Sequence, residues 1–586
     1  MAPQEAFVDP VPLFVPCSRT STEVNKTGSW RYLRPTYTEK TAPCGAACPA
    51  GEDIARIAML ASRGLFQEAW ETILQENPFP AVCGRVCFHP CEGACNRAQL
   101  DEPIAIHQLE RFLGDTALAA GTQAAVNERS AQGRKAAVVG AGPAGLAAAF
   151  FLTRLGFTCE VFEAQPEPGG LLRWGIPAYR LPKEVLQGEI KRIENRGVKI
   201  LCQTPVTART LEKIKARNDA LFIAGGYGRP IRLNIPGGEM ACDGLSFLAQ
   251  IRSPATFAIS GTAAVIGGGN TALDVARTLL RRGVEPVLVY RRRRQDMPAF
   301  APEVDMALKE GIKIKELSAP IRIAQDPNDP ESFPLNYELT LQKMKVSSTA
   351  INGRARVIPD GNKIETLRVQ GVFTAIGAEG DNLGDFPPGA NQKHLELSHC
   401  QMALQDLPVI WGGDLATPVK SVTHAIASGK QAAIALDTLF AEGWDAVATR
   451  LSACRIGSGP TVSMAAYLGG DRERRSARVV TFDEINADYF HPRARVTPVT
   501  LDVEQRLPSF AEIEQTLVTG AAREEATRCF NCGICNACDN CRLFCPEMAV
   551  AVENTARRIN LDYCKGCGIC VVECPRNAMV LEEETP

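Results

Sequence analysis

The chain has 586 residues, 45% of them hydrophobic and 22% charged, which is typical of a globular protein with several domains. Its net charge of −2 excludes the strongly basic character of a general nucleic-acid-binding protein. Cysteine is unusually frequent, with 22 residues, of which seven lie before position 96 and ten after position 528. Clusters of this kind at the two ends of a long chain indicate metal ligation in a reducing compartment and not a disulfide framework.

The apolar segments do not indicate a secreted or membrane protein. No basic stretch followed by an apolar core marks a signal peptide at the N-terminus. The longest apolar run, 136–157, is long enough for a membrane helix, but it contains Arg154 and three glycines at nucleotide-binding spacing. We interpret it as a buried strand followed by a helix, and we expect a cytoplasmic protein.

Taken in chain order, the predicted elements change character several times. Residues 1–40 are polar and contain prolines, which predicts an extended arm, and the next segment combines cysteines with helical patterns such as 52–74. Two strand–helix–strand units follow, and each implies a parallel sheet. Their strands are expected at 136–139, 159–163, 263–266 and 287–290, with helices from Pro143 and Thr271. Alternation at 336–345 suits antiparallel strands, whereas 446–525 shows weak periodicity.

The strongest motif lies near the C-terminus. Two runs of the form C-x2-C-x2-C-x3-C-P match the bacterial two-cluster ferredoxin, in which the fourth cysteine of each run ligates the other cluster. One 4Fe–4S cluster would be held by Cys535, Cys538, Cys541 and Cys574, and the other by Cys564, Cys567, Cys570 and Cys545. The alternative is structural zinc, but zinc sites rarely need eight thiolates in this spacing.

A first glycine motif joins the strand 136–139 to the helix after it. It comprises Gly140, Ala141, Gly142, Pro143, Ala144 and Gly145. This G-x-G-x-x-G sequence predicts that a pyrophosphate binds at the N-terminus of the helix. Glu163 ends the next strand, where an acidic residue can accept hydrogen bonds from a ribose.

A second glycine motif, 267–272, has alanine in place of the last glycine. Its candidate contacts to a nucleotide are Gly267, Gly269, Asn270 and Thr271. The next strand is followed by Arg291 and Arg292 and not by an acid, which suits the 2′-phosphate of NADP(H). We therefore predict NADP(H), with NAD(H) as the alternative. A solvated basic turn is the other interpretation, because two more arginines follow.

The N-terminal cysteines form a less regular set. Cys87, Cys91 and Cys95 recur at every fourth position near prolines, which indicates cluster ligation, and Cys44 and Cys48 precede them. Taken singly, Cys83 and Cys17 are better interpreted as free thiols. The same interpretation applies to the isolated cysteines Cys159, Cys202, Cys242, Cys400 and Cys454.

These motifs, in this order, resemble the small subunit of NADPH-dependent glutamate synthase and the matching half of dihydropyrimidine dehydrogenase. The resemblance spans about residues 40–440 and is carried by 77–80, 84–87, 169–182, 267–274, 290–292 and 412–414. It implies that the first glycine motif binds FAD together with Glu163, Gly170, Leu171, Arg180, Gly413 and Asp414. It also implies that the second unit binds NADP(H), with Arg291 and Arg292 on the 2′-phosphate.

The resemblance also implies ligands for an N-terminal 4Fe–4S cluster, namely Cys48, Cys87, Cys91 and Glu110. The family has a second N-terminal cluster that begins at a C-x2-C, and this chain has none before Cys44. We therefore predict one complete cluster in the N-terminal domain. Cys44 and Cys95 are left as half of a site, and Cys529 and Cys532 form a surplus C-x2-C pair. Our hypothesis is that these two pairs meet and complete another cluster.

The predicted fold is multi-domain α/β. It combines an α-helical iron–sulfur domain, two nested Rossmann-like domains for FAD and NAD(P), and a C-terminal α+β bacterial-type ferredoxin domain. The expected boundaries are 1–40 for the arm, 41–120 for the iron–sulfur domain, 130–255 with 371–445 for the FAD domain, 256–370 for the NAD(P) domain, 446–525 for a connecting segment and 526–586 for the ferredoxin domain.

The predicted function is that of a FAD-dependent NAD(P) oxidoreductase that passes electrons between iron–sulfur clusters, FAD and NAD(P). Hydride transfer would rest on the flavin, with no catalytic side chain. The ferredoxin domain resembles electron-input subunits that accompany 2-oxoacid:ferredoxin oxidoreductases, so we expect other subunits of such a complex, or a ferredoxin, as partners. Neither nucleic acid nor a membrane is expected as a partner.

Three alternatives compete with this function. The first is a glutamate synthase-type NADPH-oxidising subunit that feeds a separate reductase. The second is a non-catalytic scaffold that only conducts electrons, which an intact FAD motif disfavours. A disulfide reductase of the thioredoxin reductase type is disfavoured because the cysteines between 140 and 440 are single.

Overall fold

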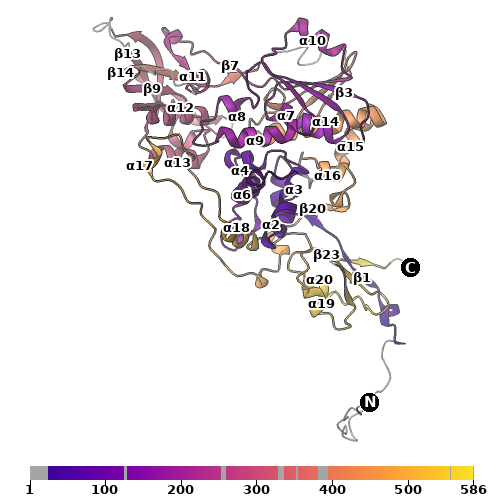
Figure 1. The fold of residues 1–586 in the computed structure, drawn as a ribbon. Helices are drawn as coiled ribbons and strands as arrows, with labels where there is room; N and C mark the ends of the chain where they lie inside the picture. The colour runs from indigo at the N-terminus through magenta and orange to yellow at the C-terminus, as the bar shows by residue number, and fades with distance from the viewer. Residues whose placement is uncertain are drawn as a thin grey trace.

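The computed structural model describes residues 24–123, 129–251, 259–326, 336–351, 354–380, 393–554 and 556–584. The first part of the predicted arm, including Cys17, lies outside these residues. Figure 1 shows two nucleotide-binding units side by side, a helical domain beneath them, and the ferredoxin module at the far end. Strands β1 (Leu33–Tyr37) and β23 (Met579–Glu583), near the two ends of the described residues, both lie in that module (Figure 1).

The first nucleotide-binding unit is built on a seven-stranded sheet in the order β17-β18-β19-β6-β3-β4-β5. Its strands are β3 (Lys135–Val139), β4 (Thr158–Phe162), β5 (Lys199–Leu201), β6 (Ala220–Ile223), β17 (Lys393–Glu396), β18 (Gln401–Leu404) and β19 (Pro408–Trp411). The five strands from β19 to β5 run parallel. Helices α7 (Pro143–Arg154) and α14 (Val422–Glu442) pack against each other, and most of their residues are buried.

The second unit has a parallel five-stranded sheet in the order β11-β10-β9-β15-β8. Its strands are β8 (Cys242–Asp243), β9 (Gly261–Ile266), β10 (Val284–Val289), β11 (Lys313–Lys315) and β15 (Gly371–Thr374), and its helices are α11 (Gly244–Gln250), α12 (Asn270–Arg281) and α13 (Ala301–Lys309). The expected antiparallel strands are present as β12 (Ser318–Gln325), β13 (Tyr337–Ile351) and β14 (Arg354–Val369).

Two predicted domain boundaries need correction. The sequence assigned residues up to 255 and from 371 onward to the FAD domain. The structure pairs β8 with β15, and β15 with β9, so both of these strands complete the second sheet. The chain therefore enters the second unit earlier and leaves it later than expected.

The N-terminal domain consists of short amphipathic helices, as expected for 52–74. Its principal helices are α2 (Ile54–Ser62), α3 (Phe66–Leu74), α4 (Pro80–Val86) and α6 (Ile106–Ala119). Two buried charged groups join it to the FAD unit. Glu189 on α9 (Lys183–Glu194) accepts hydrogen bonds from the first amides of α4, and Lys430 on α14 pairs with Glu76 at 2.6 Å.

The ferredoxin module incorporates part of the predicted arm. The module contains α19 (Asn540–Leu543), β21 (Val550–Glu553), β22 (Ala556–Ile559), α20 (Ile569–Val572) and β23 (Met579–Glu583). The described part of the arm contains strand β1 (Leu33–Tyr37), which pairs antiparallel with β23. Lys40 follows this strand; it is 2% exposed and donates to Asn577 Oδ1 at 2.6 Å.

The connecting segment, residues 446–525, lies along all the other parts of the molecule. It contains α15 (Ala446–Ala453), α16 (Met464–Tyr467), β20 (Ser476–Val479), α17 (Val503–Arg506) and α18 (Thr519–Thr527). Strand β20 pairs with β2 (Lys40–Thr41), and Arg475 pairs with Asp53 at 2.8 Å. Farther on, the segment reaches α17 beside the second nucleotide-binding unit before it returns to α18 (Figure 1). Within the described ranges, no helix is both long and apolar enough to cross a membrane.

Candidate nucleotide and cluster sites

The glycines predicted to bind FAD meet where β3 ends and α7 begins. Gly140 has a φ of +98°, and a Cβ atom there would lie 2.4 Å from the carbonyl oxygen of Ala224. A Cβ on Gly170 would lie 2.8 Å from the Cα of Gly142, so the Gly-Gly-Leu turn rests directly on the glycine loop. Backbone packing this close frees the N-terminus of α7 for a pyrophosphate, and the loop therefore fits FAD.

Glu163 lies next to this loop, immediately after β4. Its carboxylate accepts hydrogen bonds from the backbone amides of Ala141 at 2.7 Å and Gln165 at 2.8 Å. Because an ionised carboxylate offers about four acceptor positions, it can still accept hydrogen bonds from a ribose. The position of Glu163 therefore suits its predicted role.

The Gly-Gly-Asp turn approaches the same helix from the other side. A Cβ on Gly413 would lie 2.9 Å from the Cβ of Ala144 on α7. Asp414 lies in the short helix η6 (Gly413–Leu415), and burial raises the pKa of its carboxyl group. Leu171 begins α8 (Leu171–Trp174) and is 40% exposed. The predicted FAD contacts other than Arg180 thus surround the N-terminus of α7.

Arg180 forms ion pairs that the sequence did not predict. Its guanidinium forms ion pairs with Asp274 on α12 at 2.8 Å and with Glu303 on α13 at 3.0 Å. Although burial opposes the charge, these two carboxylates raise the pKa of Arg180. The arginine is buried between the two nucleotide-binding units, and its contact with FAD stays a prediction.

The second glycine motif has the same packing pattern. A Cβ on Gly267 would lie 2.4 Å from the carbonyl oxygen of Ala375, whereas a Cβ on Gly269 would meet no atom within 4 Å. Asn270 begins α12, and its Oδ1 accepts a hydrogen bond from the amide of Phe300 at 2.9 Å. Thr271 follows in the first turn. Open space at Gly269 leaves the N-terminus of α12 accessible to a nucleotide phosphate.

The arginines after β10 differ in their surroundings. Arg291 is exposed, and Arg292 donates through Nε to the carbonyl oxygen of Ala355 at 3.2 Å. Arg293 pairs with Asp296 at 2.8 Å. The contact of Arg291 and Arg292 with a 2′-phosphate stays a prediction.

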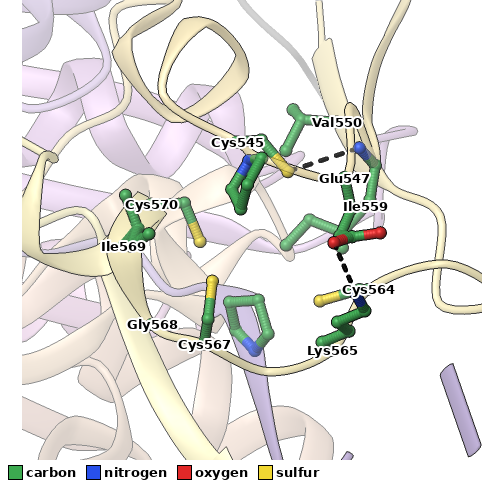
Figure 2. A pocket seen from close by; sticks show the side chains of 13 residues that line it. Cys545, Glu547, Val550, Ile559, Cys564, Lys565, Cys567, Gly568, Ile569 and Cys570 are labelled. Carbon is green, nitrogen blue, oxygen red and sulfur yellow. Dashed lines mark hydrogen bonds and ion pairs between the residues drawn. The ribbon is translucent and has the colours of Figure 1, made fainter. Parts of the chain in front are cut away.

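The ferredoxin module contains two pockets lined by its cysteines. The sulfurs of Cys545, Cys564, Cys567 and Cys570 face the first pocket (Figure 2). The second pocket is lined by Cys535, Cys538, Cys541 and Cys574. Each pocket thus combines three cysteines of one run with the last cysteine of the other, and these residues fit two 4Fe–4S clusters. One cysteine of each set, Cys567 or Cys538, is exposed.

Two further residues at the second pocket belong to no sequence motif and were not predicted. The hydroxyl of Tyr37 lies 3.2 Å from Cys541 Sγ, within hydrogen-bonding distance, and burial raises the pKa of its phenol. Arg576 lines the same pocket. Tyr37 comes from β1, so only the pairing of the two chain ends brings it to this site.

The predicted N-terminal ligands lie together in the helical domain. Cys48 follows α1 (Pro43–Ala47), Cys87 follows α4, and Cys91 lies in α5 (Pro90–Gly93). Burial raises the pKa of the Cys91 thiol, and the nearby charges of Cys48 and Cys87 raise it further. Cys87 Sγ lies 3.9 Å from the hydroxyl of Thr423 on α14, so this set adjoins the FAD unit.

Glu110 on α6 completes the set. Burial, together with the charge of Glu52, raises the pKa of its carboxyl well above the ordinary value. Asn77 donates to Glu52 at 2.7 Å and to Glu110 at 2.9 Å, and the thiol of Cys83 donates to Asn77 Oδ1 at 3.9 Å. Three thiols and a buried carboxyl are suitable ligands for iron, so these residues fit a cluster.

The comparisons with known proteins agree with this architecture. The model of the pyridine nucleotide-disulphide oxidoreductase family matches residues 134–429. The model of dihydropyrimidine dehydrogenase domain II, a 4Fe–4S cluster domain, matches 36–122, and that of a 4Fe–4S binding domain matches 557–580.

Several characterised proteins are similar over most of the chain. The beta subunit of the NADP(+)-dependent formate dehydrogenase of Moorella thermoacetica is 32% identical, covering 84% of this chain and 70% of that protein. The beta subunit of the NADPH-Fe(3+) oxidoreductase of Geobacter sulfurreducens is 31% identical, covering 84% and 75%. Subunit PreT of the NAD-dependent dihydropyrimidine dehydrogenase of Escherichia coli is 32% identical, covering 67% and 90%.

Among solved structures, FprA of Mycobacterium tuberculosis in complex with NADPH aligns with a TM-score of 0.43 at 19% identity, covering 55% of this chain and 86% of that chain.

The chain is therefore a FAD-dependent NAD(P) oxidoreductase and belongs to the pyridine nucleotide-disulphide oxidoreductase family. It is a member that carries 4Fe–4S domains in both its N-terminal and C-terminal regions. The predicted fold class, the cofactors and the resemblance to dihydropyrimidine dehydrogenase are confirmed.

Proposed function

We propose that this chain is the electron-transfer subunit of a larger oxidoreductase complex and links NADP(H) to a partner subunit. Bound FAD exchanges a hydride with the nicotinamide and single electrons with iron–sulfur clusters. The chain's own residues bind and orient the nucleotides. The N-terminus of α7 and Glu163 hold FAD, while Arg291 and Arg292 recognise the 2′-phosphate of NADP(H).

The observation that supports this proposal is that the ferredoxin cluster sites are partly exposed, whereas the N-terminal cluster site is buried. Each ferredoxin pocket has one exposed cysteine, Cys567 or Cys538, whereas Cys48, Cys87 and Cys91 are buried beside the FAD unit. An enzyme that only oxidised NADPH with a small acceptor would have no use for two further cluster sites at its surface. The exposed pockets therefore favour electron exchange with another protein.

The surface of the ferredoxin module suits a stable partner. Large apolar side chains are exposed on and beside α19 and α20, namely Leu543, Phe544, Met548, Ile569 and Val572. Val572 is 72% exposed and Met548 86%. Because exposed apolar groups on a small domain are typical of protein–protein contacts, we propose a packed interface that does not depend mainly on charge.

The proposed partner oxidises a 2-oxoacid, because low-potential ferredoxin-type clusters suit electrons from that reaction. A formate-oxidising partner is the second candidate, and it is favoured by the relative named as a formate dehydrogenase subunit, which matches 84% of this chain. The complex purified from its native cells would separate the two. If the complex reduces NADP+ with a 2-oxoacid, the first candidate is supported. If it reduces NADP+ with formate but not with a 2-oxoacid, the second is supported.

The interface itself can be tested with Leu543→Glu/Val572→Glu in an affinity-tagged full chain. The partner subunit should copurify at a tenth or less of the wild-type amount, because two charges would be buried at the contact. Ile364→Glu on β14, a position 57% exposed in the other half of the molecule, is the matched control and should copurify the partner normally. Equal recovery of the partner with all three chains would refute docking at this surface.

A further inference from the structure

Among the cysteines outside the three cluster sites described above are two pairs, Cys44 with Cys95 and Cys529 with Cys532. Cys44 lies in α1, and Cys95 immediately precedes the short helix η3 (Asn96–Gln99). Cys529 and Cys532 lie in the loop between α18 and the ferredoxin runs. The first pair and the second pair are more than four hundred residues apart along the chain. Cys44 and Cys532 are buried.

Several hydrogen bonds hold these two regions together. Asn96 donates through Nδ2 to Cys532 Sγ at 3.5 Å, and Arg97 donates to the carbonyl oxygen of Arg528 at 2.9 Å. The amide of Lys40 donates to the carbonyl oxygen of Gly533 at 2.8 Å. The cysteine loop is thus fixed on the N-terminal domain by contacts next to Cys95 on one side and near Cys44 on the other.

The packing around the loop leaves little room for movement. A Cβ on Gly533 would lie 2.6 Å from the carbonyl oxygen of Lys40, and Asn531 donates to the carbonyl oxygen of Ala55 at 2.9 Å. Phe530, between the two cysteines, is 1% exposed. The loop is therefore held by close packing and hydrogen bonds, as expected for a loop that binds a ligand and not for a flexible linker.

The charges of these cysteines affect one another's pKa. Burial raises the pKa of the Cys44 thiol, and the charges of Cys95, Cys529 and Cys532 raise it further. Burial likewise raises the pKa of Cys532, to which Cys529 and Cys95 add. Cys44 and Cys532 are buried and Cys95 and Cys529 are half-buried, so thiolates in this region would repel one another, and a bound cation cluster would compensate that charge.

We propose that Cys44, Cys95, Cys529 and Cys532 hold a fourth 4Fe–4S cluster, assembled from the N-terminal domain and the loop before the ferredoxin runs. A C-x2-C pair plus two separate cysteines is a sufficient ligand set for such a cluster. This inference deepens the proposed function, because it supplies a cluster site between the surface pockets and the site beside FAD.

The position of the site favours iron–sulfur over zinc, which four thiolates could also bind. Cys44 and Cys95 each lie four residues along the chain from a ligand of the N-terminal set, Cys48 or Cys91. On the other side, the amide of Gly533 donates to the carbonyl oxygen of Arg576, which lines the second ferredoxin pocket, at 2.7 Å. The proposed site therefore adjoins one cluster site on each side, where zinc, which has no redox chemistry, would interrupt electron transfer.

The first test needs no variant. The full-length chain, reconstituted anaerobically, should contain about sixteen iron and about sixteen acid-labile sulfide per chain, since each cluster contributes four of each. About twelve of each would overturn the proposal. Bound zinc with about twelve iron would assign the four cysteines to a structural metal site, and this result would also overturn it.

The second test uses paired variants. Cys529→Ser/Cys532→Ser should lose about four iron, and Cys44→Ser/Cys95→Ser should lose the same number. Because all four residues share one site, the quadruple variant should lose about four and not about eight. A loss of about eight would mean two independent sites and would refute the proposal. Cys202→Ser/Cys242→Ser, at isolated half-buried and exposed positions, is the control and should retain all iron.

These measurements are independent of the proposed function. Iron and sulfide content does not depend on a partner or on the nicotinamide. If copurification with a partner failed while the paired variants each lost about four iron, the site would stand and the proposed function would fall. Far-UV circular dichroism and the FAD content show whether each variant has folded.

Discussion

Arg291 and Arg292 follow β10 after Tyr290, where the adenosine ribose of a dinucleotide is expected. If they bind the 2′-phosphate, Arg291→Ala/Arg292→Ala should lower kcat/KM for NADPH about 10- to 100-fold, because charge-assisted hydrogen bonds contribute about 1.5–3 kcal/mol. The value for NADH should change little. Steady-state kinetics with both nucleotides measures this difference.

The neighbouring Arg293 provides the control for that experiment. It pairs with Asp296 at 2.8 Å, so Arg293→Ala should leave the preference for NADPH over NADH unchanged. If the wild-type chain had the same kcat/KM for NADH as for NADPH, the basic turn would not recognise the 2′-phosphate.

At the residue scale, the sequence predicts sites whose ligands are close in the chain. The runs 535–545 and 564–574 repeat a spacing that fits a cluster, and the structure gathers each predicted set around one pocket. Arg180 shows the limit of this approach. Its motif implied FAD, but its partners Asp274 and Glu303 come from a different unit. No local pattern specifies such a long-range ion pair.

At the element scale, the contact between α9 and α4 depends on one buried carboxyl. Glu189 is 0% exposed and accepts hydrogen bonds from the amides of Ala81 at 2.8 Å and Val82 at 3.1 Å. Burial raises its pKa to about 7, although the two amides oppose this effect. Its contribution to stability is therefore fully present below the unfolded pKa of about 4.3 and is lost as pH rises through about 7.

Replacing Glu189 with glutamine should remove this pH dependence. We expect the free energy of unfolding of the wild type, relative to Glu189→Gln, to fall by about 2 kcal/mol between about pH 5.5 and about pH 8. Thermal melts across this range measure the change. Glu184→Gln, at an exposed position of the same helix, should leave it unaltered. Parallel curves for wild type and Glu189→Gln would mean that the carboxyl does not titrate in this range.

The regular elements were predictable where periodicity is strong. Strands β3, β4, β9 and β10 and helices α7 and α12 lie where the alternation of glycine motifs and apolar runs places them. The membership of β8 and β15 was not predictable, because each is short and only pairing with its neighbour assigns it to a sheet. The pairing of β1 with β23 likewise depends on contacts between the two ends of the chain.

At the scale of the whole molecule, the connecting segment joins parts that the sequence treats as separate. Its weak periodicity predicted only a linker, since most of its residues form turns and single contacts. In the structure Arg475 pairs with Asp53 of the iron–sulfur domain, and the amide of Ile513 donates to the carbonyl oxygen of Tyr179 in the FAD unit. These contacts fix the segment on the iron–sulfur domain and on the FAD unit, and its last helix, α18, leads directly to Cys529 and Cys532.

The two nucleotide-binding units are joined by a buried cluster of ion pairs. Arg180 of the FAD unit pairs with Asp274 and Glu303, and Arg277 on α12 pairs with Glu310 at 2.8 Å. Although burial opposes it, hydrogen bonds from Arg281 and Arg277 lower the pKa of Glu310 to about 2. Such a cluster is costly to disrupt from one side, because each removed charge leaves a partner buried and unpaired.

Arg180→Ala tests whether this residue joins the units or binds FAD. As a joining residue, its loss should cost about 3–5 kcal/mol, because the buried carboxylate of Asp274 loses its partner. The melting temperature should fall by about 2–4 °C if the chain unfolds as one unit, and Arg180→Ala/Asp274→Ala should lose less than the sum of the two single variants. FAD content should stay near one per chain in all three. The opposite result would be an Arg180→Ala chain that keeps its melting temperature but has lost FAD, and a double variant that does not regain FAD. Arg180 would then bind FAD, as the sequence resemblance implied.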